Sequence, residues 1–185
     1  MANTFLKFSQ SALQLDQNGA DQNASDNSIP GESQDQNLPQ WIEIGSWSWG
    51  ESNPGTWGTG GGGGGSQLGF QDLSFSAPVS SASTAVMLAC ANGQHFPFAS
   101  LVCRKVGGAG QPYVYLQIGL ANVTVSGYQG GGSDGDGSAM DMYSLNYQVI
   151  QAQYFTQDVS GNVAASAPSF YYDRSKKTTQ PTGSS

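Results

Sequence analysis

Positive charge is scarce in this sequence of 185 residues. It has six lysines and arginines in total, and none lies between Lys7 and Arg104 or between Lys105 and Arg174. Proteins that bind DNA, RNA or an anionic membrane surface use clustered basic residues to meet the phosphates. With a formal net charge of −7, the chain is predicted to bind neither nucleic acid nor an anionic membrane.

Long apolar runs are also missing. No segment approaches the roughly 18 apolar residues of a membrane-spanning helix. The first residues, MANTFLKFSQSALQLDQNG, lack the apolar centre of a secretory signal peptide. We therefore expect a protein that is made in the cytoplasm without a signal peptide, is not inserted in a membrane and, if it leaves the cell, does so by another route.

Residues that commonly carry catalysis are few. The single histidine, His95, has no nucleophile motif around it, so a structural hydrogen bond is expected rather than a hydrolase site. Cys90 and Cys103 have neither CxxC nor metal-binding spacing and are predicted to be reduced, buried thiols. Paired carboxylates can cleave sugars, but nothing in the sequence brings together the four candidates, Glu43, Glu51, Asp72 and Asp141. No enzyme activity and no cofactor are predicted.

Aspartates occur in two stretches that could hold calcium. The stretch DQNGADQNASDN loosely resembles a calcium loop, but an EF-hand needs Gly at position six and Glu at position twelve, where this chain has Asp21 and Asn27. Asp134 and Asp136 in GGGSDGDGS are explained as well by a glycine-rich turn. We interpret the first stretch as part of a solvated polar insertion, residues 16–36, and predict no metal site.

Glycine, by contrast, forms a run of six after TWGT. A phosphate-binding loop would end in Gly-Lys-Ser or Gly-Lys-Thr and lead into a helix, whereas here Ser66 and Gln67 follow and a strand is predicted. We interpret the run as one limb of a long loop, residues 50–66, between strands of one domain. The six residues are Gly60, Gly61, Gly62, Gly63, Gly64 and Gly65.

Strand patterns fill most of the remaining sequence. In QWIEIGSWSWG, a bulge at residues 45–46 would place Ser48 on the outer face and four apolar residues on the core side. These four are Ile42, Ile44, Trp47 and Trp49. In VYLQIGL, the residues expected on one face are Val114, Leu116, Ile118 and Leu120. With FLKF, LGFQDLSFS, ASLVCRKV, NVTVSGY, YSLNYQVIQAQYFTQ and SFYYDR, the pattern predicts about seven strands in an antiparallel barrel or sandwich.

One helix is predicted in VSSASTAVMLACANG. Ser83 is expected to cap its N-terminus, and Gly93 is expected to supply the left-handed residue that ends it. A narrow apolar face would consist of Val86, Met87 and Cys90. The helix should therefore be short, about ten residues, and should flank the sheet.

Several segments in this order resemble one known family. They are SWSWGESNPGTWGTGGGGGGSQLGFQDLSFS, LACANGQHFPFASLVCRKVGGAGQPYVYLQI, LANVTVSGYQGGGSDG, YSLNYQVIQAQY and TQDVSGNVAASAPSFYYDRSKK. The chain is similar here to the hemolysin-coregulated protein (Hcp) family, the tube protein of type VI secretion, which typically reads "SWG", a glycine-rich loop, "FQDLSF", "ACANGKH" and "LRKAGG". The resemblance runs from Phe5 to about Lys177, so we expect one domain over residues 1–177 and a disordered tail over residues 178–185.

The resemblance implies a small antiparallel β-barrel of two sheets with one short flanking helix and a long extended loop. It implies homohexameric rings that stack into a tube inside a contractile sheath, capped by a valine-glycine repeat spike protein. Contraction would expel tube, spike and effector cargo to the extracellular space or a target cell. Two alternatives stay open. One is a stand-alone glycan- or ligand-binding β-sandwich that uses Trp47, Trp49 or Trp57 as stacking platforms, and the other is a ring-forming effector carrier without long tubes.

The resemblance also suggests roles for individual residues. Ser48 is expected to face the pore, or alternatively a neighbouring subunit. The extended loop is expected to contact the next subunit or ring through Glu51, Asn53, Pro54, Gly55, Trp57 and the six glycines. Structural roles are expected for Trp47, Trp49, Phe70, Phe75 and His95. Relatives carry lysines in "FTKYVDKASP" and "ANGKH" where this chain reads FSAPVSSASTA and ANGQH, so charged contacts between subunits should be absent or replaced by hydrogen bonds.

Overall fold

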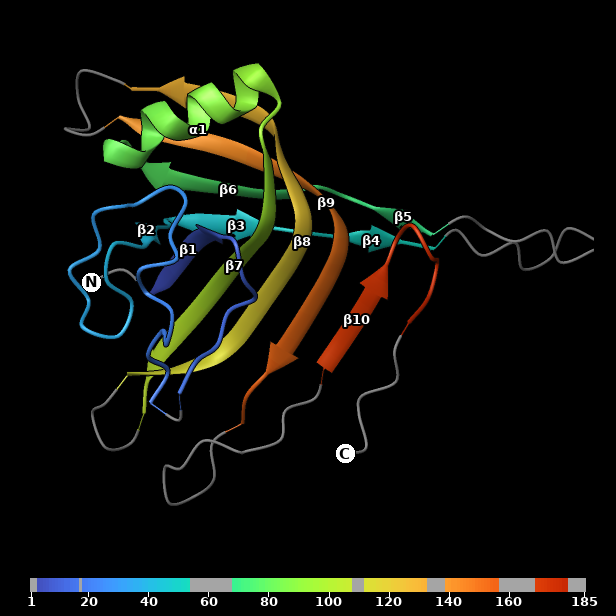
Figure 1. The fold of residues 1–185 in the computed structure, drawn as a ribbon, viewed down its shortest axis with the longest axis horizontal. Coiled ribbons are helices and arrows are strands. Elements are labelled where there is room, and N and C mark those ends of the chain that lie inside the picture. Colours follow the sequence, from blue (N-terminus) through green and yellow to red (C-terminus); the bar gives the residue numbers. More distant parts are fainter. Residues whose placement is uncertain are drawn as a thin grey trace, which may run out of the picture.

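A curled antiparallel sheet with one helix beside it dominates the molecule (Figure 1). The computed structural model describes residues 3–16, 18–53, 68–107, 112–132, 139–156 and 169–179. The elements in these ranges are β1 (Thr4–Ser9), β2 (Ile42–Glu43), β3 (Ser46–Ser48), β4 (Glu51–Ser52), β5 (Gly69–Phe70), β6 (Leu73–Pro78), α1 (Ser81–Asn92), β7 (His95–Val106), β8 (Pro112–Gly131), β9 (Met140–Tyr154) and β10 (Ser169–Asp173).

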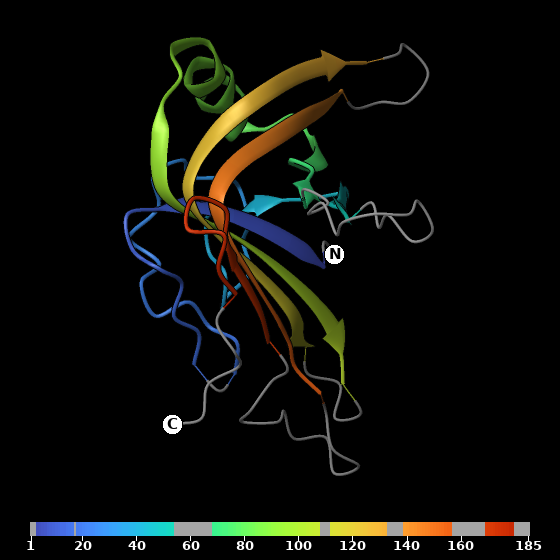
Figure 2. The same ribbon diagram turned by 90° about the vertical axis from the view of Figure 1, so that its right-hand side faces the viewer.

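One short segment, residues 42–48, pairs with both edges of the sheet. The strand order is β2-β1-β7-β8-β9-β6-β3, with β10 also on β9. Ile44 donates its N–H to the carbonyl of Thr4 on β1 at 2.9 Å, and Gly45 donates to Ser76 on β6 at 2.8 Å. The chain thus joins the two edges of the curled sheet, whose long strands β8 and β9 arch together in Figure 2. The predicted class, mainly β with a barrel-like antiparallel sheet and one helix, is confirmed.

This change of partner strand takes the place of the bulge predicted at residues 45–46. The four residues predicted for the core side reach it, two of them buried and the two tryptophans half-buried against the same core: Ile42, Ile44, Trp47 and Trp49. Ser48 is exposed on the other side. The phase of the strand pattern changes because the chain leaves β1 and joins β6.

The part of the sheet formed by β1, β7 and β8 is buried on both faces. The main core lies on one face, and a second apolar cluster of Phe5, Leu38, Trp41, Val102 and Val114 lies on the other. The prediction that Val114 shares a face with Leu116, Ile118 and Leu120 is wrong. The partner of Cys103 on β8 is Leu116 and the partner of Arg104 is Val114, so Tyr115 is an extra residue in a β-bulge that turns Val114 to the second cluster.

Helix α1 begins earlier than the pattern predicts. Its N-cap is Ser80, not Ser83, and the Ser83 hydroxyl accepts a hydrogen bond from the Ser80 N–H at 2.9 Å. The predicted apolar face is wrong at Met87, which is 46% exposed. The buried face consists of smaller residues at helical spacing, Ala82, Ser83, Val86 and Ala89, which let the helix lie close to the sheet. Within the described ranges, no helix is long and apolar enough to span a membrane.

Gly93 ends α1 in the left-handed conformation, with φ of 65°. Gly93→Ala is expected to lower the free energy of unfolding by about 1 kcal/mol, because a Cβ disfavours this backbone conformation. Gly119→Ala is the matched control, since a Cβ at either glycine would meet nothing within 4 Å and only Gly93 has a positive φ. Urea unfolding measures both variants, and a Gly93→Ala protein as stable as the wild type would contradict the assignment.

Candidate functional site

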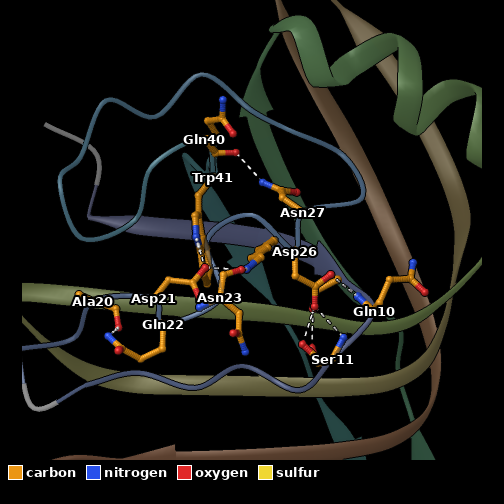
Figure 3. Close-up of polar contacts among 12 residues, drawn as sticks. Gln10, Ser11, Ala20, Asp21, Gln22, Asn23, Asp26, Asn27, Gln40 and Trp41 are labelled. Carbon is orange, nitrogen blue, oxygen red and sulfur yellow. Dashed lines mark hydrogen bonds and ion pairs between the residues drawn. The ribbon is translucent and has the colours of Figure 1, made fainter.

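The loop between β1 and β2, residues 10–41, packs on the sheet and is called the N-terminal loop below. The prediction of a solvated insertion over residues 16–36 is wrong in this respect: Asp21, Ile29 and Ser33 are all buried. Glu32 extends the loop to the helix, since its carboxylate accepts the N–H of Ser81 at 2.8 Å. The loop therefore connects β1, the helix N-terminus and the start of β2. Figure 3 shows the contacts within the loop around Asp21 and Asp26.

Asp21 is the centre of this loop. Its carboxylate accepts hydrogen bonds from the ammonium of Lys7 at 2.6 Å and from the indole Nε1 of Trp41 at 3.1 Å. Lys7 also donates to the carbonyl of Asn23 at 2.7 Å, and both side chains of the ion pair are almost fully buried. Sequence reasoning missed this pair, and its only signal was a lysine within the apolar strand FLKF.

A second ion pair fastens the other part of the loop. Arg104 on β7 donates two hydrogen bonds to the carboxylate of Asp35, at 2.9 and 2.5 Å, and its guanidinium lies 4.6 Å from the ring centroid of Phe5. The Arg104 hydrogen bonds, helped by the backbone N–H groups of Asn37 and Leu38, hold the pKa of Asp35 below its ordinary value. Two ion pairs thus tie the N-terminal loop to two different strands, β1 and β7.

The aspartates of the calcium-like stretch accept hydrogen bonds from backbone N–H groups. Asp16 accepts from the N–H groups of Asn18 and Ala20 at 2.8 and 2.9 Å. Asp26 accepts from the N–H groups of the two residues after β1, at 2.8 and 2.9 Å. In the part of the chain that the structure describes, no three His, Cys, Asp or Glu side chains are placed to share a metal ion. Asp134 and Asp136 lie outside the described residues.

Ser48 belongs to a hydroxyl-rich area on the outer side of β3, β6, β8 and β9, which we call the serine face. Its members are Ser46, Ser48, Ser74, Ser76, Ser126 and Ser144. The hydroxyls of Ser46 and Ser76 lie 2.8 Å apart, and those of Ser126 and Ser144 lie 3.0 Å apart. A groove of about 510 Å³ crosses this face, and none of the residues that line it is charged.

The root of the extended loop is a two-stranded ribbon of β4 and β5. Glu51 pairs with Phe70, and Glu51, Ser52 and Asn53 are all exposed. The remaining predicted contact residues lie outside the described residues, namely Pro54, Gly55, Trp57, Gly60, Gly61, Gly62, Gly63, Gly64 and Gly65. The structure therefore describes the start of the predicted contact loop, and the contact roles of all its residues stay predictions.

Aromatic rings support that ribbon from inside. Phe70 lies with its ring centroid 4.7 Å from that of Tyr172 and 6.2 Å from that of Trp49. Trp49 also donates its indole N–H to the hydroxyl of Tyr147. Phe75, another predicted structural residue, is buried in the main core. The ribbon thus rises from a packed aromatic base.

Of the four candidate catalytic carboxylates, the two aspartates have structural hydrogen-bond partners. Asp141 is 1% exposed and accepts hydrogen bonds from the hydroxyls of Tyr128 and Tyr143, each at 2.7 Å. The hydrogen bond to Asp141 raises the pKa of Tyr128 to about 12. Asp72 accepts from Asn146 at 2.7 Å and from a serine hydroxyl at 2.5 Å. These groups hold strands and the serine face in place.

The thiols and the histidine form no site together. Cys90 is half-buried and Cys103 is buried, and both are free. Burial raises the pKa of the Cys103 thiol, which keeps it protonated near neutral pH. His95 is exposed at the start of β7, so the structural role expected for it stays a prediction.

Comparisons with known proteins agree on one family. The sequence profile of the family described as "Type VI secretion system effector, Hcp" matches residues 13–154. The protein named Protein hcp1 from Pseudomonas aeruginosa is 38% identical over 95 residues, which cover 51% of this chain and 58% of that protein. This chain therefore spans little more than half of that relative's length.

Solved structures give the same result for the fold. One described as a type six secretion system protein has a TM-score of 0.79 at 20% identity, covering 97% of this chain and all of its own. Hcp1 from Salmonella typhimurium has a TM-score of 0.68 at 25% identity, covering 97% of this chain and 100% of its own. A type VI secretion system effector from Yersinia pestis has a TM-score of 0.66 at 20% identity, with coverages of 92% and 98%.

The buried pair of Lys7 and Asp21 makes a first prediction about this site. Asp21→Asn is expected to lower the free energy of unfolding by about 3 kcal/mol, because it leaves the ammonium buried without an opposite charge. Glu43→Gln is the control, since it removes an exposed carboxylate and should change stability by less than about 0.5 kcal/mol. Urea unfolding followed by tryptophan fluorescence measures both, and equal stability of the two variants would refute the role of Asp21.

The pair of Arg104 and Asp35 makes a prediction about pH. The folded pKa of Asp35 lies below its ordinary value of 3.8, so its contribution is complete above that pH and is lost as the pH falls through the folded pKa. The free energy of unfolding should therefore decrease below about pH 4, and the decrease should be smaller in Asp35→Asn. Thermal unfolding at a series of pH values tests this, and identical acid slopes for both proteins would count against it.

Proposed function

The chain belongs to the Hcp family of the type VI secretion system, and from this we propose that it is a structural subunit of the inner tube of such a machine. On this proposal, homohexameric rings stack into a tube inside a contractile sheath and carry a valine-glycine repeat spike protein. Contraction expels the tube with effector cargo, so the subunit leaves the cytoplasm as part of the tube. On this proposal the subunit builds the wall of the tube and catalyses no reaction.

The observation that carries the proposal is the extent of the family match. Residues 13–154 include nearly all of the N-terminal loop, the segment that closes the sheet, the helix and every strand from β2 to β9. The match therefore concerns most of the fold, all but β1 and β10, and not one motif. A fold alone does not define an activity, so the surfaces must also suit a tube.

The serine face suits the wall of a pore. Ser48 and the other hydroxyls are exposed or half-exposed, and the groove that crosses them carries no charge. The Asp72 carboxylate beside this face is hydrogen-bonded to Ser126 and Asn146, so cargo in the groove itself would meet uncharged hydroxyl groups. We assign Ser48 to the lumen side of the ring on this ground.

The ribbon of β4 and β5 suits contact with another subunit or ring. Glu51 and Asn53 are exposed at the point where the chain enters the long loop. A ring subunit needs two different complementary surfaces, because like surfaces would pair once and stop. We assign this role to Glu51, Asn53 and the rest of the loop, with Trp57 as its aromatic anchor.

The glycan-binding alternative has less support. A stacking platform needs a free aromatic face, whereas Trp47 and Trp49 are half-buried and pack against the main core. Trp49 also uses its indole N–H on Tyr147. The ring-forming effector carrier is not weakened by these contacts, and only the state of assembly separates it from a tube subunit.

Negative-stain electron microscopy of the purified chain tests the proposal. We expect six-fold rings and stacked tubes, and we expect Trp57→Ala to form rings but shorter tubes at an unchanged melting temperature. Trp57→Phe, which keeps an aromatic ring, is the control and should stack like the wild type. Rings that never stack would favour the effector carrier, and a monodisperse monomer of 19.3 kDa that binds sugars would refute both ring-forming functions.

A further inference from the structure

The few cations of this chain fall into three groups. All six lysines and arginines lie in the described ranges. Lys7 and Arg104 are buried in ion pairs with the N-terminal loop. Three others lie in the C-terminal turn at residues 174–177. Lys105 at the end of β7 is therefore the one exposed cation elsewhere on the subunit.

Lys105 lies beside two exposed side chains and two less accessible tyrosines, of which Tyr113 is buried and Tyr115 is half-buried. Its ammonium is 5.4 Å from the ring centroid of Tyr113 and 5.2 Å from that of Tyr115. Tyr154 packs edge-on to Tyr115 with ring centroids 6.4 Å apart. Val106 is 68% exposed and Tyr154 is 44% exposed. We call Lys105, Val106, Tyr113, Tyr115 and Tyr154 the lysine–tyrosine patch.

Two features of the fold hold this patch in shape. The β-bulge at Tyr115 turns Val114 toward the N-terminal loop and leaves Tyr113 and Tyr115 beside Lys105. The neighbouring residue, Arg104, is fixed to Asp35 by two hydrogen bonds. The lysine is thus presented on an ordered strand end, so less side-chain entropy is lost when a partner binds.

The chemistry of the patch favours the binding of an exposed carboxylate. Aromatic rings with an exposed apolar neighbour are typical of contact surfaces, and a single ammonium among them selects a negative group. Hydrogen bonding with Tyr113 raises the pKa of Lys105, so the ammonium is fully charged near neutral pH. Because the chain itself has a net charge of −7, another copy can supply such a group.

We propose that the lysine–tyrosine patch receives Glu51 from the β4–β5 ribbon of another copy of this chain, and that this contact joins successive rings. The inference rests on the proposed tube function and names the surface that meets the extended loop. Glu51 is exposed and has no ion pair with any described residue. Glu43, also exposed, lies in β2, which pairs with β1 in the main sheet and is not part of the β4–β5 ribbon.

The positions of the two surfaces fit a repeating contact. In Figure 1 the end of β7 and the start of β8 lie at the lower left, whereas β4 and β5 lie at the right of the molecule. A contact between two different surfaces of identical subunits is heterologous and propagates along a stack instead of closing a dimer. An exposed ion pair is weak by itself, but six copies in each ring–ring interface would act together.

Charge reversal tests the inference. We expect Lys105→Glu and Glu51→Lys each to reduce the fraction of protein in sedimentable tubes roughly tenfold at low salt, and the double variant to restore it. Lys177→Glu and Glu43→Lys are matched controls, because they reverse an exposed charge outside the two surfaces and should stack like the wild type. Hexameric rings, counted by electron microscopy, should persist in every variant.

The outcomes separate the inference from the proposed function. A wild-type chain that forms no rings would overturn the tube function and the inference with it. Tubes of normal length from both single reversals, or rescue of Lys105→Glu by Glu43→Lys as well as by Glu51→Lys, would overturn the inference alone. If Lys105→Glu loses its fold by circular dichroism, Lys105→Gln and the salt dependence of wild-type tubes decide instead. Stacking that is unchanged in Lys105→Gln and independent of salt concentration in the wild type would refute the contact.

Discussion

The carboxylate of Asp21 holds together the parts of the chain on which closure of the sheet depends. It binds Lys7 on β1 and Trp41, the residue directly before β2. The segment that follows Trp41 is the one that pairs with β1 and then with β6. The position of Trp41 therefore sets where this segment enters the sheet. A buried ammonium without its carboxylate would be costly, so Lys7 on β1 keeps this part of the N-terminal loop against the sheet.

This closure decides which surfaces remain for function. Around Phe5, Val102 and Val114, both faces of the sheet are covered, one by the main core and the other by the N-terminal loop. Polar groups that could have formed a reactive site instead hold turns, cap the helix or bind tyrosine hydroxyls, as Asp26, Glu32 and Asp141 do. The surfaces left for other molecules include the serine face, the β4–β5 ribbon and the lysine–tyrosine patch. Contact and assembly suit such surfaces better than catalysis.

Local patterns predicted the elements but not always their faces. The left-handed end of α1 at Gly93 follows from glycine alone, and it is found. Met87 and Val114 were placed on the wrong side because period counting assumes an unbroken face. At α1 the smaller alanines face the sheet, and in β8 the bulge at Tyr115 reverses the phase. The face on which a side chain lies depends on the neighbours that it meets in the folded sheet, and the sequence of a single strand or helix does not specify those neighbours.

The sequence by itself determined a mainly β chain with one helix, few charged residues and an ordered set of segments similar to the Hcp family. These follow from composition, from period two in the strands and from glycine at special backbone positions. Only the tertiary structure decided that the polar N-terminal loop is anchored and that Lys7, Arg104 and Tyr115 have defined partners. The reason is that ion pairs and bulges join residues far apart in the chain, such as Arg104 and Asp35, and their energy exists only once the sheet has brought them together.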